Sequence, residues 1–221
     1  MQRIGDSLKG RRVLITQSDD FMGPALKETF EFYNANVYCD PRELLSQNII
    51  DDVIANANEP EIVLLNLVYP FKFSTHLEID TFEWKSCFAH MVDPLPKIAK
   101  LVLPSMLKNR QGKIVVMGSA TAIDSKFGGP AYSAARGAQM SWVKKIGADM
   151  AKHNIQINYI AQAFVSNPTF FPNGANEEDL KLIPANRLAD ASECTALAVF
   201  LSSFESNFFA GQCFPIAGGL V

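Results

Sequence analysis

The chain has 221 residues, a mass of 24.4 kDa and a formal net charge of −3, from 20 Lys and Arg against 23 Asp and Glu. Hydrophobic residues make up 48% of the chain, which together with the low net charge excludes a disordered protein. The slightly acidic balance argues against a dedicated nucleic-acid binder. No apolar run reaches the roughly 18 residues of a membrane span, and residues 1–10 lack the apolar core of a secretory signal. We therefore expect a cytoplasmic protein.

Taken in chain order, short apolar runs alternate with longer segments of helical character. Strands are predicted at residues 11–17, 36–40, 61–68, 113–118, 155–161 and 213–216. Helices are predicted at residues 24–33, 44–57, 81–106, 131–153 and 192–203. Pro94 and Pro96 must kink or break the third helix, because proline removes a backbone donor and clashes with the preceding turn.

Strict alternation of strands and helices predicts an α/β protein with a parallel sheet flanked by helices on both faces, a three-layer Rossmann-like fold. No linker, repeat or low-complexity segment interrupts the pattern, so residues 1–221 are predicted to form one domain. Ligands of such sheets bind at the carboxyl ends of the strands. Three segments should therefore matter: those following Gln17, Met117 and Ala161.

The chemistry is expected from Ser119, Tyr132 and Arg136. Ser119 ends a predicted strand, and Tyr132 and Arg136 lie four residues apart on a predicted helix, so their side chains should be neighbours. A fixed cation beside a phenol favours the phenolate, which can take a proton from a substrate hydroxyl. A serine nearby can hold the substrate oxygen by a hydrogen bond. By spacing alone, a tyrosine and an arginine on a helix can equally be a surface pair.

This set, with Tyr132-Ser-Ala-Ala-Arg136, resembles the active-site motif of short-chain dehydrogenases/reductases, except that those enzymes carry lysine at the position of Arg136. The order of strands and helices over nearly the whole chain agrees with that superfamily. A Ser-Tyr-Arg set resembles the halohydrin dehalogenases, which are cofactor-free relatives with the same fold. The resemblance therefore implies a base, Tyr132, that works without a nicotinamide.

The first βα turn is an independent test of cofactor use. A dinucleotide site needs glycines there, so that the backbone can approach the pyrophosphate. The reductase pattern is Thr-Gly-x-x-x-Gly-x-Gly, but residues 16–23 read TQSDDFMG, with Gln17 and Phe21 at two of the glycine positions and only Gly23 retained. Asp40 at the end of the second strand would be the usual partner of an NAD ribose. With the glycines gone, we interpret Asp40 as structural.

The segment after the fifth strand, residues 162–172, is rich in aromatic residues and proline, and resembles the halide pocket of halohydrin dehalogenases. The resemblance implies a wall at Phe21, backbone N–H groups of Phe164 and Val165 directed at the anion, and closure by Phe171. Phe170 belongs to the same loop. The halide-binding residues implied in this way are Phe21, Gln162, Ala163, Phe164, Val165 and Phe171.

By this resemblance the chain is a carbon–halogen lyase that converts vicinal haloalcohols to epoxides, releases halide, and opens epoxides with small anions in reverse. No cofactor is expected, and no metal, because the three histidines and four cysteines are scattered. The fold also implies a homotetramer through the two long helices. The substrate pocket is expected to draw on residues 71–75 and 121–129. Two alternatives stay open: an NAD(P)-dependent reductase with a divergent cofactor turn, and a non-catalytic binding relative of the same fold.

Overall fold

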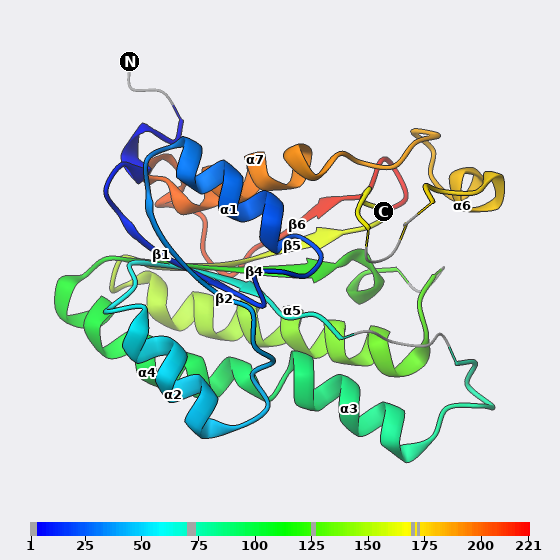
Figure 1. Ribbon diagram of the computed structural model, residues 1–221, viewed down its shortest axis with the longest axis horizontal. Coiled ribbons are helices and arrows are strands. Elements are labelled where there is room, and N and C mark those ends of the chain that lie inside the picture. The colour runs from blue at the N-terminus through cyan, green and yellow to red at the C-terminus, as the bar shows by residue number, and fades with distance from the viewer. Residues whose placement is uncertain (1–3, 70–73, 125–126, 169–170, 172) are drawn as a thin grey trace.

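The computed structural model describes residues 4–69, 74–124, 127–168, 171 and 173–221. Its centre is a six-stranded sheet in which all strand pairs are parallel, in the order β2-β1-β3-β4-β5-β6. The strands are β1 (Arg12–Thr16), β2 (Asn36–Asp40), β3 (Ile62–Asn66), β4 (Gly112–Ser119), β5 (Ile155–Gln162) and β6 (Cys213–Ile216). They run in one direction, so all their carboxyl ends meet at one edge of the sheet (Figure 1).

Helices cover both faces of the sheet (Figure 1). One face carries α1 (Gly23–Phe32) and α7 (Ala191–Ser202), and the other carries α2 (Gln47–Asn56), α4 (Pro94–Asn109) and α5 (Pro130–Ala151). A further helix, α3 (Thr81–Met91), packs against α5, and a short helix, α6 (Glu177–Lys181), lies beyond the carboxyl ends of the strands. This arrangement confirms the predicted three-layer Rossmann-like fold.

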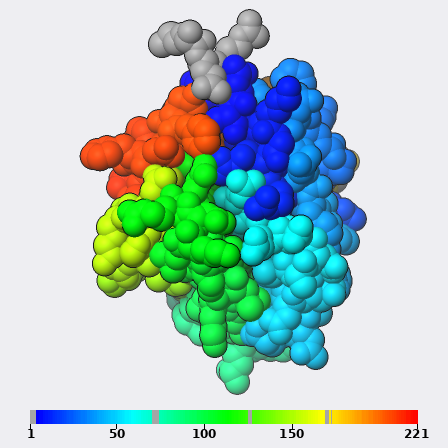
Figure 2. Space-filling model, turned by 90° about the vertical axis from the view of Figure 1, so that its left-hand side faces the viewer, coloured from blue at the N-terminus to red at the C-terminus, as the bar shows by residue number. Residues whose placement is uncertain are grey.

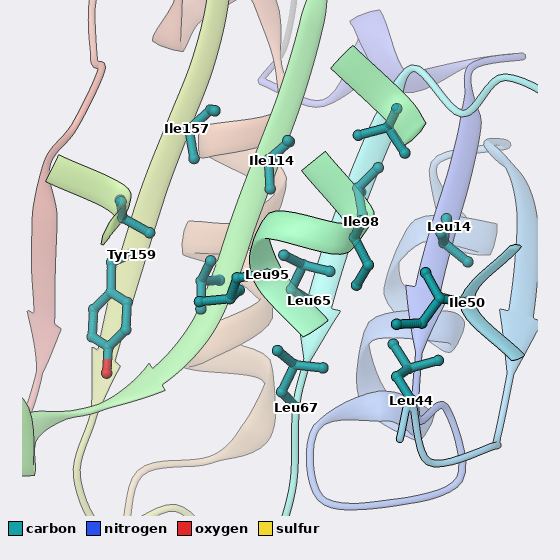
Figure 3. Close-up of a cluster of buried hydrophobic side chains, with 14 of the residues drawn as sticks. Leu14, Leu44, Ile50, Leu65, Leu67, Leu95, Ile98, Ile114, Ile157 and Tyr159 are labelled. Carbon is teal, nitrogen blue, oxygen red and sulfur yellow. The ribbon is translucent and has the colours of Figure 1, made fainter. Parts of the chain in front are cut away.

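Two hydrophobic clusters hold the layers together, one on each face of the sheet. In the larger cluster, side chains from the strands, such as Leu65 and Ile114, meet Leu95 and Ile98 of α4 (Figure 3). Every residue of β3, β4 and β5 is buried. Continuous burial is expected of strands covered on both faces, and it explains why apolar residues predominate in these segments.

The predicted long helix over residues 81–106 is in fact two helices. The chain leaves α3 after Met91 and starts α4 at Pro94. Proline is favoured in the first turn of a helix, where its missing N–H has no partner to lose, so the prolines mark a new start. The sequence prediction missed α6, whose capping box joins Asn176 and Asp179. None of the described helices combines the length and the apolar character needed to cross a membrane.

The amino ends of the strands form the face shown in Figure 2, where the N-terminal segment lies beside the chain around residues 203–210. Lys113 of β4 is buried beneath this face, with 2% of its surface exposed. Its Nζ donates to Ser206 Oγ at 3.0 Å and to Asn207 Oδ1 at 2.8 Å. Burial, reinforced by the charge of Arg11, lowers the pKa of Lys113 from 10.5 to about 7.

This pKa predicts that stability increases with pH. Below pH 7 both the folded and the unfolded chain hold the Lys113 proton, and the full cost of burying the charge is present. Between pH 7 and 10.5 the folded chain releases the proton while the unfolded chain keeps it, so the free energy of unfolding should rise by up to about 1.4 kcal/mol per pH unit. Urea unfolding at pH 7 and pH 9 measures this slope.

Lys113→Met should remove most of that slope, whereas Lys108→Met, at an exposed position of α4, should leave it in place. If Lys113→Met does not reduce the pH dependence of the free energy of unfolding, that dependence comes from other groups.

Candidate active site

Ser119 is the last residue of β4 and lies at the carboxyl edge of the sheet. The ring of Tyr159, from the neighbouring strand β5, passes so close to Gly118 that a Cβ there would lie 1.8 Å from Tyr159 Cζ. The Tyr159 hydroxyl accepts from Ser119 N at 2.8 Å and donates to Ser119 O at 3.2 Å. Burial raises the pKa of Tyr159. It therefore stays protonated and fixes the backbone of Ser119.

The side chain of Ser119 is oriented by Thr121, a residue that the sequence analysis did not single out. Both the backbone N–H of Thr121, at 3.2 Å, and its hydroxyl, at 3.1 Å, donate to Ser119 Oγ. With its oxygen accepting two hydrogen bonds, Ser119 has its own proton left to donate to a ligand. A short turn directly after the serine, residues 120–122, brings Thr121 into place.

Tyr132 and Arg136 lie one turn apart near the start of α5, as their spacing predicts. The guanidinium carbon of Arg136 is 5.0 Å from the centre of the Tyr132 ring. Arg136 is 2% exposed, so it is a buried cation behind the tyrosine, not half of a surface pair.

The partners of Arg136 are uncharged. Its Nη1 donates to Gln139 Oε1 at 2.9 Å and to Met117 O at 3.3 Å, and its Nε is buried without a partner among the described residues. Gln139 in turn donates to Met91 O at 2.6 Å, at the end of α3. Within the described part of the chain, no carboxylate forms an ion pair with Arg136. The positive charge is therefore directed at the tyrosine and at whatever binds beside it.

A cavity of about 680 Å³ opens at this edge of the sheet. It brings together nearly all the residues expected to form a site: Phe21, Ser119, Tyr132, Gln162, Ala163, Phe164, Val165 and Phe171. Arg136 does not line the cavity; it stands behind Tyr132. Thr121, Phe127 and Gly128 supply the contribution expected from residues 121–129.

The walls of the cavity differ in chemical character. On one side Phe127 and Phe164 stack with ring centres 5.0 Å apart, and Phe164 contacts Phe171 at 6.0 Å. Four polar residues also line the cavity: Asn167, Asn173, Asn176 and Asp179. The expected loop residues Phe170 and 71–73 lie outside the described residues. The cavity therefore combines aromatic side chains with hydrogen-bonding groups around Ser119 and Tyr132.

The first βα turn keeps the backbone of a glycine-rich turn without its glycines. Gln17 and Phe21 both have left-handed backbones, with φ of 43° and 46°, a conformation that costs a residue other than glycine about 1 kcal/mol or more. Gly23 is required, since a Cβ there would lie 2.2 Å from Ser18 O. The amide of Gln17 is buried and bridges to Val68 after β3, with Nε2 donating to Val68 O at 3.1 Å and Oε1 accepting from Val68 N at 2.8 Å.

Asp40, the residue best placed to meet a ribose, is occupied within the protein. Its carboxylate accepts from Arg42 Nε at 3.0 Å, from Arg42 Nη2 at 2.7 Å and from the Tyr38 hydroxyl at 3.3 Å. These hydrogen bonds, led by that of the Arg42 side chain, lower the pKa of Asp40 despite the opposing effect of burial. The contacts of Asp40 are thus made within the protein, as expected for a structural residue.

A family model described as enoyl-(acyl carrier protein) reductase matches residues 9–221. A 3-oxoacyl-[acyl-carrier-protein] reductase of Thermotoga maritima is 32% identical over 56% of this chain and 51% of its own length, so the chain spans about half of that relative. The corresponding reductase of Salmonella typhimurium is 24% identical over 97% of this chain and 98% of its own length. A 3-oxoacyl-[acyl-carrier protein] reductase from Brucella melitensis, solved with bound NAD, has a TM-score of 0.87 at 22% identity, covering 99% of this chain and 94% of the other.

These matches overturn the halohydrin dehalogenase interpretation. The matching family and the relatives are reductases, so the interpretation as a carbon–halogen lyase acting on haloalcohols, epoxides and halide is wrong. The structure supplies a physical reason. Gln162, which lines the cavity, donates its amide nitrogen to Gly118 O at 3.3 Å, so its unpartnered group is the amide oxygen, an acceptor that would repel a halide.

The departures from the reductase pattern at Gln17, Phe21 and Arg136 thus lie within a reductase framework. The match covers nearly the whole length, and it includes the strand that ends at Ser119 and the helix that carries Tyr132. The chain belongs to the enoyl-(acyl carrier protein) reductase family.

Proposed function

We propose that this chain is an NAD(P)-dependent oxidoreductase of the short-chain type, which interconverts a carbonyl group and a hydroxyl group. The observation that carries the proposal is the placement of Ser119 and Tyr132 on one cavity with the buried cation of Arg136 behind the tyrosine. Membership of a reductase family supports it. The bound NAD of the Brucella relative supports the choice of cofactor class.

In this proposal the Ser119 hydroxyl donates a hydrogen bond to the carbonyl oxygen of the substrate. Thr121 keeps the serine hydrogen available for this bond, because its own hydrogen bonds occupy the acceptor sites of Ser119 Oγ. Tyr132 transfers its phenolic proton to the same oxygen as a general acid, and takes it back in the reverse direction as a general base. Arg136, 5.0 Å from the ring, stabilises the negative charge on the phenol oxygen once the proton has left.

The residues at the reacting end fit a nicotinamide. The cavity reaches from Gly118 and Ser119 to residues 163–165, and the backbone N–H groups of Phe164 and Val165 donate to no backbone carbonyl in the described part of the chain. These N–H groups would hold the carboxamide oxygen. The cofactor supplies the hydride.

The adenosine end fits only after a rearrangement. The Gln17 amide bridges β1 to the segment after β3, at the sheet edge where the pyrophosphate of a dinucleotide would lie, and Asp40 is engaged by Arg42. A dinucleotide must displace the Gln17 side chain to bind. We therefore expect weak dinucleotide binding compared with a glycine-rich turn.

Calorimetric titration with NADH and NADPH tests the proposal, followed by absorbance at 340 nm in the presence of a panel of small ketones and a 3-oxoacyl thioester. Saturable binding of one dinucleotide and its oxidation by at least one carbonyl compound are expected. Failure of both dinucleotides to bind at millimolar concentration would overturn the proposal.

A second candidate is a non-catalytic binding relative of the same fold, and the filled turn at Gln17 is the observation in its favour. In that case carbonyl ligands would bind to the cavity, but no carbonyl compound would oxidise a dinucleotide. The absorbance assay on wild type and Tyr132→Phe separates the two functions: turnover that Tyr132→Phe loses supports the oxidoreductase, and carbonyl binding without any turnover supports the binding relative.

A further inference from the structure

Gln162 occupies a special position in the cavity. It is the last residue of β5, directly opposite Ser119 in the register of β4 and β5. Neighbouring strands lie about 4.8 Å apart, so the two side chains start one strand spacing from each other. Gln162 lines the cavity together with Ser119 and Tyr132, yet only 2% of its surface is exposed.

The orientation of the Gln162 amide is fixed by its neighbour. Nε2 donates to Gly118 O at 3.3 Å. The opposite orientation would place two carbonyl oxygens against each other, so the nitrogen must face Gly118 and the oxygen must face away from it. Oε1 is buried, and no donor in the described part of the chain reaches it. Buried acceptors nearly always have a donor, so this oxygen is an unfilled hydrogen-bonding position in the cavity wall.

Several side-chain donors around the ends of β4 and β5 are already used by the protein. Thr121 donates twice to Ser119 Oγ, and the Tyr159 hydroxyl is engaged with the backbone of Ser119. Asn167, another cavity residue, donates its amide nitrogen to Val165 O at 2.6 Å. Since no described donor reaches Gln162 Oε1, a donor on the ligand can fill this position.

We infer that Gln162 is a specificity determinant: its Oε1 accepts a hydrogen bond from an O–H or N–H group adjacent to the carbonyl that Ser119 and Tyr132 hold. This inference rests on the proposed function. Because Gln162 stands one strand from Ser119, the donor is placed one or two bonds from the reacting carbonyl, as in an α-hydroxy ketone. The carboxamide N–H of a nicotinamide is a second source of the same donor chemistry.

The substrate source is tested with a matched pair, hydroxyacetone and butanone, in which a hydroxyl replaces a methyl group of similar size. Wild type should favour hydroxyacetone in kcat/KM by about tenfold or more, since a site built to bond a hydroxyl rejects the analogue that lacks it. Gln162→Met, of similar length and shape, should abolish the preference. Gln156→Met, on the same strand at the opposite end of the sheet, should retain it, because the Gln156 amide donates to Asn154 there, away from the cavity.

The cofactor source is tested by calorimetry with NAD⁺ and its 3-acetylpyridine analogue, in which a methyl group replaces the amide nitrogen. If the carboxamide is the donor, wild type binds NAD⁺ about tenfold more tightly than the analogue, as expected for one hydrogen bond, and Gln162→Met binds both equally.

A readout without turnover is the shift of the thermal unfolding midpoint on addition of each ketone. Hydroxyacetone should raise the midpoint of wild type more than butanone does, and Gln162→Met should show equal shifts. If the ketone ratio, the dinucleotide ratio and the thermal shifts are all the same in Gln162→Met as in wild type, the inference is overturned while the proposed function stands. If wild type neither binds dinucleotides nor oxidises them, the proposed function fails, and the thermal shifts alone decide the role of Gln162.

Discussion

Tyr132→Phe is expected to lower kcat for carbonyl reduction by about 10²- to 10⁴-fold, the usual contribution of a positioned proton donor. The phenol lines the cavity beside Ser119, and the only cation behind it among the described residues is Arg136, at 5.0 Å from the ring. Removing the hydroxyl removes the proton that the substrate oxygen needs and leaves the shape of the site intact. KM should change little, because Ser119 still holds the oxygen.

The measurement is the initial rate of NADPH or NADH oxidation at saturating substrate. Tyr33→Phe is the matched control: Tyr33 caps α1 on the far side of the sheet, and its loss of a hydroxyl should leave kcat unchanged. A Tyr132→Phe variant with wild-type kcat would remove Tyr132 from the reaction. A variant that loses affinity for the substrate instead of turnover would give the tyrosine a binding role.

The sequence was sufficient for the fold because the signals are local and repeated. Buried strands such as β3 read as apolar runs, and the tyrosine and arginine of α5 lie four apart, a spacing that brings them together in any helix. The ends of β1, β4 and β5 had to meet because parallel strands share an edge. The prolines around position 94 predicted an interruption, which the structure resolves into two helices.

The function could not be predicted in the same way. The sequence shows that Gln17 replaces a glycine of the turn. It does not show that the Gln17 side chain is hydrogen-bonded to Val68, which is 51 residues away in the sequence. The direction of the Gln162 amide depends on Gly118 O, and the proton of Ser119 depends on Thr121. Such contacts decide whether a cavity attracts an anion or a hydrogen-bond donor. These contacts form only in the folded chain. The Ser119, Tyr132 and Arg136 pattern alone was therefore also compatible with a dehalogenase.

The turn itself provides the second large expected effect: Gln17→Gly should tighten dinucleotide binding by about 30-fold. A dinucleotide must break the two buried hydrogen bonds between the Gln17 amide and Val68, at 3.1 and 2.8 Å. At about 1 kcal/mol each, these bonds hold back roughly 2 kcal/mol of binding free energy. Glycine also adopts the φ of 43° without strain, so the backbone of the turn is preserved.

Calorimetry with NADH and NADPH measures the change, and two further variants identify its cause. Gln17→Ala removes the same amide but keeps a Cβ on the left-handed backbone. If the Gln17 side chain obstructs the dinucleotide, Gln17→Ala should tighten binding nearly as much as Gln17→Gly does. If backbone strain at residue 17 weakens binding instead, Gln17→Ala should tighten binding far less. Asn34→Gly, at a left-handed residue with φ of 57° after α1, relieves strain away from the site and should leave dinucleotide affinity unchanged. Unaltered affinity in Gln17→Gly would mean that the dinucleotide binds without displacing the Gln17 amide. The low affinity expected of wild type would then need another cause, such as the ion pair between Asp40 and Arg42.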